Sequence, residues 1–191
     1  MKYRACCFAL MSLLGVVAVW AQRFDDLFAD RTLRVDYIFS GNANTQQISV
    51  DELRCAEGWY GRRTNMDKLL LRGNGRIVMT DTTACDTLYI TSFSTLFQEW
   101  QSTEEAAKVH KSFENVFLLP MPRKPVDVTV MLTDTHGRSS ARFTHRVDPS
   151  DILIRPAQKA YEWQYVRKGG DSRGCIDFTF VPEGYTQDEM P

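Results

Sequence analysis

The segment from Val126 to Val147 constrains the fold most, because apolar residues recur at every second position on both sides of a short polar turn. The residues on the predicted buried face are Val126, Val128, Val130 and Leu132 before the turn, and Ala141, Phe143 and Val147, together with His145, after it. A period of two places these side chains on one face of each strand, with polar side chains on the other. The pattern predicts an antiparallel hairpin with one buried face, closed by a turn at 135–137.

Shorter alternating runs of the same kind occur earlier in the chain. They predict strands over 33–39, 48–53, 76–81, 87–93 and 113–119, with a further short strand at 152–154. Residues 22–30 are interpreted as a short helix or an arm. Ser102 and Glu105 have the spacing of a capping box, which predicts a helix after Ser102. Short alternating strands separated by turns predict a mainly β fold: an antiparallel, immunoglobulin-like β-sandwich with one or two short helices.

The two ends of the sequence differ from this middle part. Residues 1–21 combine basic Lys2 and Arg4 with an apolar run from Ala5 to Val19, as in a secretory signal peptide. A transmembrane anchor is the alternative, but the run is shorter than the roughly 20 residues that span a bilayer. At the other end, strand-like alternation at 176–180 precedes Thr186 and Glu189, a second capping-box spacing. We therefore expect a signal peptide at 1–21, the sandwich at 22–155, a linker at 156–174 and, at 175–191, the truncated start of an α/β domain.

Charge and cysteine content limit the classes of partner. Without Lys2 and Arg4, the sequence has 21 basic and 24 acidic side chains, and this acidic excess gives no support for nucleic-acid binding. No segment after the signal suggests a membrane partner. Three cysteines remain: Cys55, Cys85 and Cys175. Export permits a disulfide, and Cys55 with Cys85 is the most natural pair, but three free or buried thiols are an equal alternative.

Motifs that would carry catalysis or hold a metal are absent from the sequence, so we predict no catalytic residue, metal ligand or cofactor in this chain. Its histidines, His110, His136 and His145, do not form H-E-x-x-H, and no G-x-S-x-G is present. His145 lies on an apolar strand face and is interpreted as a hydrogen-bonded core or rim residue. Gly73-Asn74-Gly75 is interpreted as a turn rather than a phosphate-binding loop.

A dense aromatic group occurs in the segment 92–100. Phe93, Phe97 and Trp100, with Leu96, are interpreted first as core residues, because aromatic side chains dominate sandwich cores. The alternative is an exposed contact surface for a neighbouring domain or a ligand.

Several blocks resemble the N-terminal domain of the IgA-peptidase family of secreted bacterial zinc metallopeptidases (peptidase family M-sixty-four), as found in Bacteroidetes. The blocks lie at 33–41, 59–63, 70–75, 91–100, 112–117 and 143–149, and Cys175-Ile-Asp with Pro182-Glu-Gly-Tyr-Thr186 resembles the opening of the catalytic domain. The resemblance implies a β-sandwich followed by an α/β peptidase domain whose H-E-x-x-H histidines bind zinc. None of those residues has a counterpart in this sequence.

Two functions are therefore expected from the sequence. The first is a noncatalytic accessory domain of a secreted metallopeptidase, with the missing C-terminal peptidase domain as partner and a protein as substrate. The second is a stand-alone secreted β-sandwich module that binds a glycan or a protein. In both cases the chain would be secreted, periplasmic or at the cell surface.

Overall fold

Strands form most of the secondary structure, as the alternation predicts. The computed structural model describes residues 23–134, 138–157, 167, 169–170, 174–176 and 178–179. In chain order its elements are α2 (Phe24–Leu27), β1 (Phe28–Gly41), β2 (Gln46–Glu57), β3 (Gly75–Asp81), β4 (Thr87–Phe93), α3 (Leu96–Trp100), β5 (Lys111–Pro122), β6 (Val126–Thr133), β7 (Ser139–Val147) and β8 (Ile154–Pro156).

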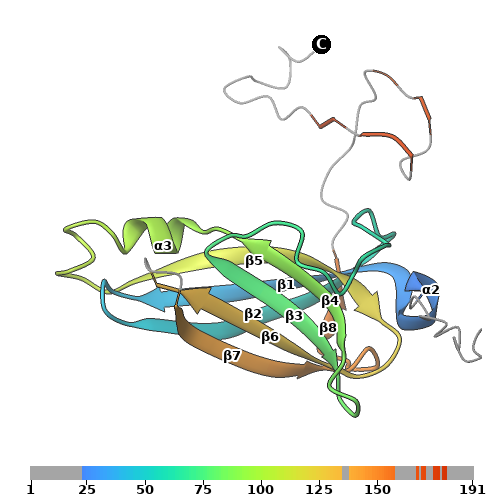
Figure 1. Ribbon diagram of the computed structural model, residues 1–191, viewed down its shortest axis with the longest axis horizontal. Coiled ribbons are helices and arrows are strands. Elements are labelled where there is room, and N and C mark those ends of the chain that lie inside the picture. The colour runs from blue at the N-terminus through green and yellow to red at the C-terminus, as the bar shows by residue number, and fades with distance from the viewer. Residues whose placement is uncertain are drawn as a thin grey trace, which may run out of the picture.

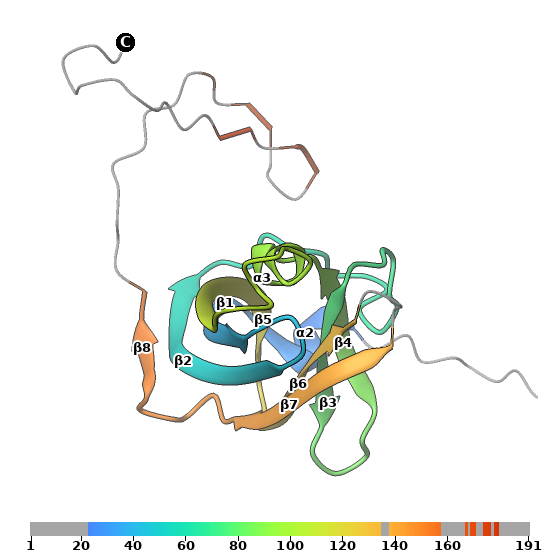
Figure 2. The same ribbon diagram turned by 90° about the vertical axis from the view of Figure 1, so that its left-hand side faces the viewer.

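The strands form two four-stranded sheets that face each other (Figures 1 and 2). One sheet has the order β5-β1-β2-β8 and the other β4-β3-β6-β7. We call them the first sheet and the second sheet. The inward residues Leu33, Val35, Tyr37 and Phe39 of β1 are completely buried, as are Val128, Val130 and Leu132 of β6. The mainly β sandwich predicted from the sequence is therefore confirmed, and the predicted hairpin is the pair β6–β7.

Three local predictions need correction. The pairing is not antiparallel throughout, since β8 runs parallel to β2, with Leu53 opposite Ile154. Strand β5 continues through Pro120 to Pro122, where an end was expected; it lies at the edge of its sheet, where a strand tolerates residues without an N–H. The helix expected after Ser102 is also absent, and residues 101–108 form turns after α3.

Helix α3 begins earlier because another polar residue caps it. The Thr95 side chain accepts a hydrogen bond from the Gln98 amide at 3.3 Å, which is an N-cap. Glu105 does not reach back to Ser102. Its carboxylate accepts hydrogen bonds from Lys111 Nζ at 2.7 Å and Trp100 Nε1 at 2.8 Å. The capping-box spacing was therefore misleading here.

The segment from Trp59 to Lys68 covers the outer edge of β4. The Ile90 amide donates to the Met66 carbonyl at 2.9 Å, and Arg62 donates to the carbonyls of Asn65, Met66, Lys68 and Ile90. The Arg62 guanidinium also lies 5.0 Å from the centre of the Tyr89 ring. Covering an edge strand in this way removes a surface on which other strands could pair.

Cys55, Cys85 and Cys175 are free thiols, which agrees with the second of the two alternatives and not with a Cys55–Cys85 pair. Cys55 is buried on β2 of the first sheet, and Cys85 is exposed in the turn between β3 and β4 of the second. Burial raises the pKa of the Cys55 thiol. Near the C-terminus, Ile176 and Phe178 are exposed and outside any strand. The turn at 135–137 and the helix start at 186–189 lie outside the described residues.

Candidate functional site

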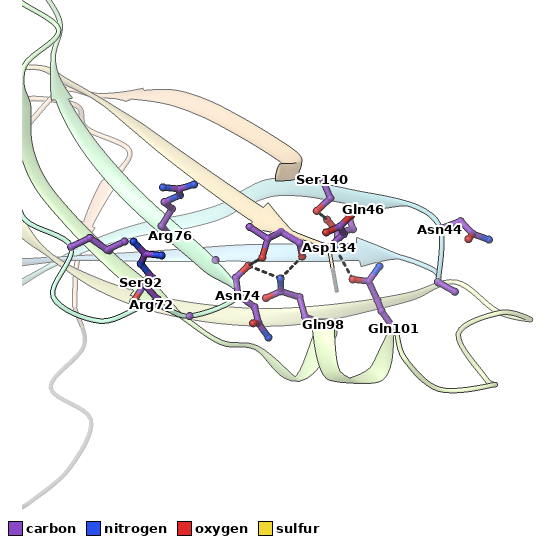
Figure 3. A pocket seen from close by; sticks show the side chains of 15 residues that line it. Asn44, Gln46, Arg72, Asn74, Arg76, Ser92, Gln98, Gln101, Asp134 and Ser140 are labelled. Atoms are coloured by element: carbon purple, nitrogen blue, oxygen red, sulfur yellow. Dashed lines mark hydrogen bonds between the residues drawn. The ribbon is translucent and has the colours of Figure 1, made fainter. Parts of the chain in front are cut away.

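A polar cleft of about 750 Å³ opens at one end of the sandwich (Figure 3). Segments far apart in the sequence meet there: the β1–β2 turn, the loop before β3, the ends of β4 and β6, α3 and the start of β7. Glycine is required at position 73 for the loop before β3 to approach the end of β4 this closely, because a Cβ atom there would lie 2.2 Å from the Phe93 carbonyl oxygen. Gly73-Asn74-Gly75 therefore forms the loop into β3, where it borders the cleft.

Glutamine side chains hold the walls of the cleft together. Gln98 of α3 is buried and donates from Nε2 to the carbonyls of Asn74 at 2.7 Å and Thr133 at 3.0 Å. Gln101 donates to the Asn42 carbonyl at 2.6 Å and accepts from Gln46 Nε2 at 2.6 Å. These amides have their hydrogen-bonding capacity largely engaged within the protein, so their role in the cleft is structural.

The cationic groups of the cleft are Arg72, from the loop before β3, and Arg76, from β3 itself. Both are exposed, and neither has a hydrogen bond or ion pair with the described residues. The cleft also contains Asp134, whose carboxylate binds Arg138 at 2.8 Å. Figure 3 shows the two arginines together at one end of the cleft and Asn44 at the other. Sequence analysis did not identify this site.

The aromatic residues considered as a contact surface lie mainly in the core. Phe97 is completely buried, so it cannot form such a surface. Phe93 is partly buried, with its ring centre 4.6 Å from that of Phe117. Trp100 is partly buried against Phe113 at 5.4 Å. The core interpretation therefore accounts for this group, although Leu96 next to it is exposed.

A side-chain hydrogen bond joins the two sheets. The hydroxyl of Tyr37 on β1 lies 2.6 Å from Nε2 of His145 on β7. This confirms His145 as a hydrogen-bonded core or rim residue. Burial raises the pKa of Tyr37. Burial also lowers the pKa of His145, although a backbone hydrogen bond at Arg146 and the charge of Asp127 oppose the change. His145 is therefore neutral at pH 7 and links the sheets without carrying charge.

This link predicts a pH dependence of stability. His145 has a pKa of about 6.5 in the unfolded chain and a lower pKa in the folded chain. At pH values between these two pKa values, the unfolded chain therefore binds more protons than the folded chain. The free energy of unfolding should therefore fall as the pH drops below about 6.5. Urea unfolding at a series of pH values measures this change in the free energy of unfolding. The same decline in a His145→Gln variant would contradict the assignment to His145.

Comparison with known families gives one finding. Residues 23–144 match the family described as "Peptidase M64 N-terminus". The chain belongs to this family. No match was found among curated proteins. The matched region of this M64 N-terminal domain starts just before α2 and ends inside β7, and it includes every segment that lines the cleft.

The structure gives roles to the blocks that resemble the M64 family. The block 33–41 is the central strand β1, and 112–117 is its neighbour β5. The block 59–63 contains Arg62, which fixes the segment over β4, and 70–75 forms one border of the cleft. The block 91–100 contains α3 and its cap. In the described part of the chain, no group of three potential metal ligands is present and no helix is long and apolar enough to cross a membrane.

Proposed function

We propose that this chain is the noncatalytic accessory domain of a secreted zinc metallopeptidase of the IgA-peptidase type. The family match over residues 23–144 carries this proposal, because it covers the sandwich as far as β7 and is to the N-terminal part of M64 peptidases. The partner would be a peptidase domain that holds the zinc ion, and the substrate class would be protein. Immunoglobulin is not implied as the substrate. The apolar segment after Lys2 and Arg4 supports export.

The chain itself should have no peptidase activity. Its 191 residues contain no H-E-x-x-H, so the pair of imidazoles and the glutamate base of that mechanism are missing. We expect the purified chain, dialysed against zinc, to retain less than one equivalent and to leave fluorescent casein intact, while an H-E-x-x-H peptidase assayed beside it cleaves. Stoichiometric zinc together with casein cleavage would contradict the proposal.

The accessory role has its own test. The nucleotide sequence after codon 191 should encode a continuation with H-E-x-x-H, in frame or after a frameshift. In the joined protein, deletion of 23–157 should lower the melting temperature or the yield of the peptidase domain. Unrelated downstream sequence would favour the second candidate, a stand-alone secreted module for a glycan or protein, which the cleft supports.

A further inference from the structure

The outer face of the second sheet has an uneven distribution of charge. In register across β4, β3, β6 and β7, the row next to the cleft consists of Ser92, Arg76, Met131 and Arg142. These side chains point away from the core, since the alternate positions Ile77, Val130 and Leu132 are completely buried. We call Arg76, Met131 and Arg142 the arginine row. Adjacent strands are about 4.8 Å apart, so the two arginines are about 10 Å apart at the backbone.

Carboxylates near this row already have partners. Asp127 binds Arg146 at 3.2 Å, and Asp134 binds Arg138 at 2.8 Å. Within the described chain, Arg76 and Arg142 have neither a hydrogen bond nor an ion pair, and the same is true of Arg72 at the cleft. Arg76 and Arg142 on this face and Arg72 at the cleft are therefore three guanidinium groups without an anionic partner among the described residues.

The outer face of the first sheet provides a contrast. There Arg34 binds Asp36 at 2.7 Å, and Glu52 binds both Arg54 at 2.6 Å and Arg155 at 3.7 Å. The three arginines named on this face thus each have a carboxylate partner, whereas on the second sheet Arg146 has one and Arg76 and Arg142 do not. Arg76 and Arg142 of the second sheet and Arg72 of the cleft beside it therefore form a local group of arginines that have no carboxylate partner among the described residues.

We propose that the arginine row and Arg72 form a docking surface for an acidic segment of a partner protein. Guanidinium groups bind carboxylates with two parallel hydrogen bonds, and three such groups suit a segment with several acidic side chains. Met131 lies between the two arginines of the row and is partly buried, which provides an apolar contact for the stems of those side chains. Arginine and methionine are both enriched at protein interfaces. A nucleic acid is disfavoured, because the chain has a net charge of −1 and a pI near 6.3.

The test measures binding of a fluorescein-labelled peptide with the repeat Glu-Leu-Glu-Ser to the full chain by fluorescence anisotropy. A Gln-Leu-Gln-Ser peptide serves as the uncharged control, and a heparin oligosaccharide as the anionic glycan. We expect the acidic peptide alone to bind, with an affinity that falls with added salt. The variant R76E/R142E should bind it at least about tenfold more weakly. The matched variant R23E/K124E makes the same charge change at exposed residues outside the row and should bind as the unmodified chain does.

Three outcomes would overturn the proposal. They are no binding of the acidic peptide, an equal loss of affinity in both variants, and tighter binding of heparin than of the peptide. The last result would assign the surface to an anionic glycan. Circular dichroism of R76E/R142E shows whether the fold is kept. If it is lost, R76Q/R142Q, which removes the charge without reversing it, is tested and must weaken peptide binding.

Discussion

Replacing Phe39 by alanine should lower the free energy of unfolding by about 3–5 kcal/mol, the usual cost of removing a buried phenylalanine ring. Phe39 is completely buried on β1, and its ring centre is 6.0 Å from Phe93, 6.4 Å from Phe97 and 6.1 Å from Phe117. Its removal therefore leaves a cavity where both sheets and α3 meet. Equilibrium urea unfolding of the full chain measures the loss.

A control for this change lies on the outer face of the same sheet. Leu118 of β5 is 58% exposed, so Leu118→Ala should change the stability by no more than about 0.5 kcal/mol. If the two variants lose similar amounts, the aromatic group is not the centre of the core. Phe39→Leu should give an intermediate loss, because it fills part of the cavity.

Replacing Arg62 by methionine should lower the free energy of unfolding by about 2–4 kcal/mol, because hydrogen bonds to charged groups contribute roughly 1.5–3 kcal/mol and their loss leaves carbonyls without a donor. Arg62 donates to the carbonyls of Asn65 at 3.0 Å and Lys68 at 2.8 Å, and also to Met66 and Ile90. The segment over β4 would lose this anchor. Amide hydrogen exchange at Ile90, whose amide donates to Met66, should become faster.

The matched control for Arg62 is Arg72→Met, which removes a guanidinium without a hydrogen bond to described residues and should leave stability unchanged. Arg62→Lys should recover little, since an ammonium group cannot reach carbonyls in several directions as the planar fork does. Recovery of full stability by lysine would mean that charge, and not hydrogen-bond geometry, holds the segment.

Strand positions could be predicted from the sequence because a buried sheet face imposes a period of two. That is why β3, β4, β6 and β7 were found close to their observed bounds, whereas β1 begins five residues before the predicted Leu33. The position of α3 was missed although a signal was present, since Thr95 and Gln98 have the same capping-box spacing as Ser102 and Glu105. Choosing between them depends on the contacts of Glu105 with Lys111 and Trp100, and these exist only in the folded chain.

The cleft and the arginine row could not be predicted in the same way. Arg72 and Arg76 flank Gly73-Asn74-Gly75, which was a visible signal, but the sequence does not show that Thr133 and Gln98 lie next to them. Arg142 joins Arg76 only through the register of β7 on β6 and of β6 on β3. Whether Arg146 has a carboxylate partner is likewise decided by strand pairing, because β6 and β7 place Asp127 opposite it.

Strand β8 has a consequence for how this domain could be joined to others. It pairs with the last part of β2, and the Ala157 amide donates to the Cys55 carbonyl at 2.8 Å. That end of β2 lies beside Arg31 near the start of β1, whereas the β1–β2 turn and the cleft lie at the other end of both strands (Figure 1). The chain thus enters and leaves the sandwich at the pole opposite the cleft. A domain joined to the chain at either position would lie about one strand length from the cleft. The covalent connection to that domain and the binding of a partner at the cleft would therefore use different surfaces.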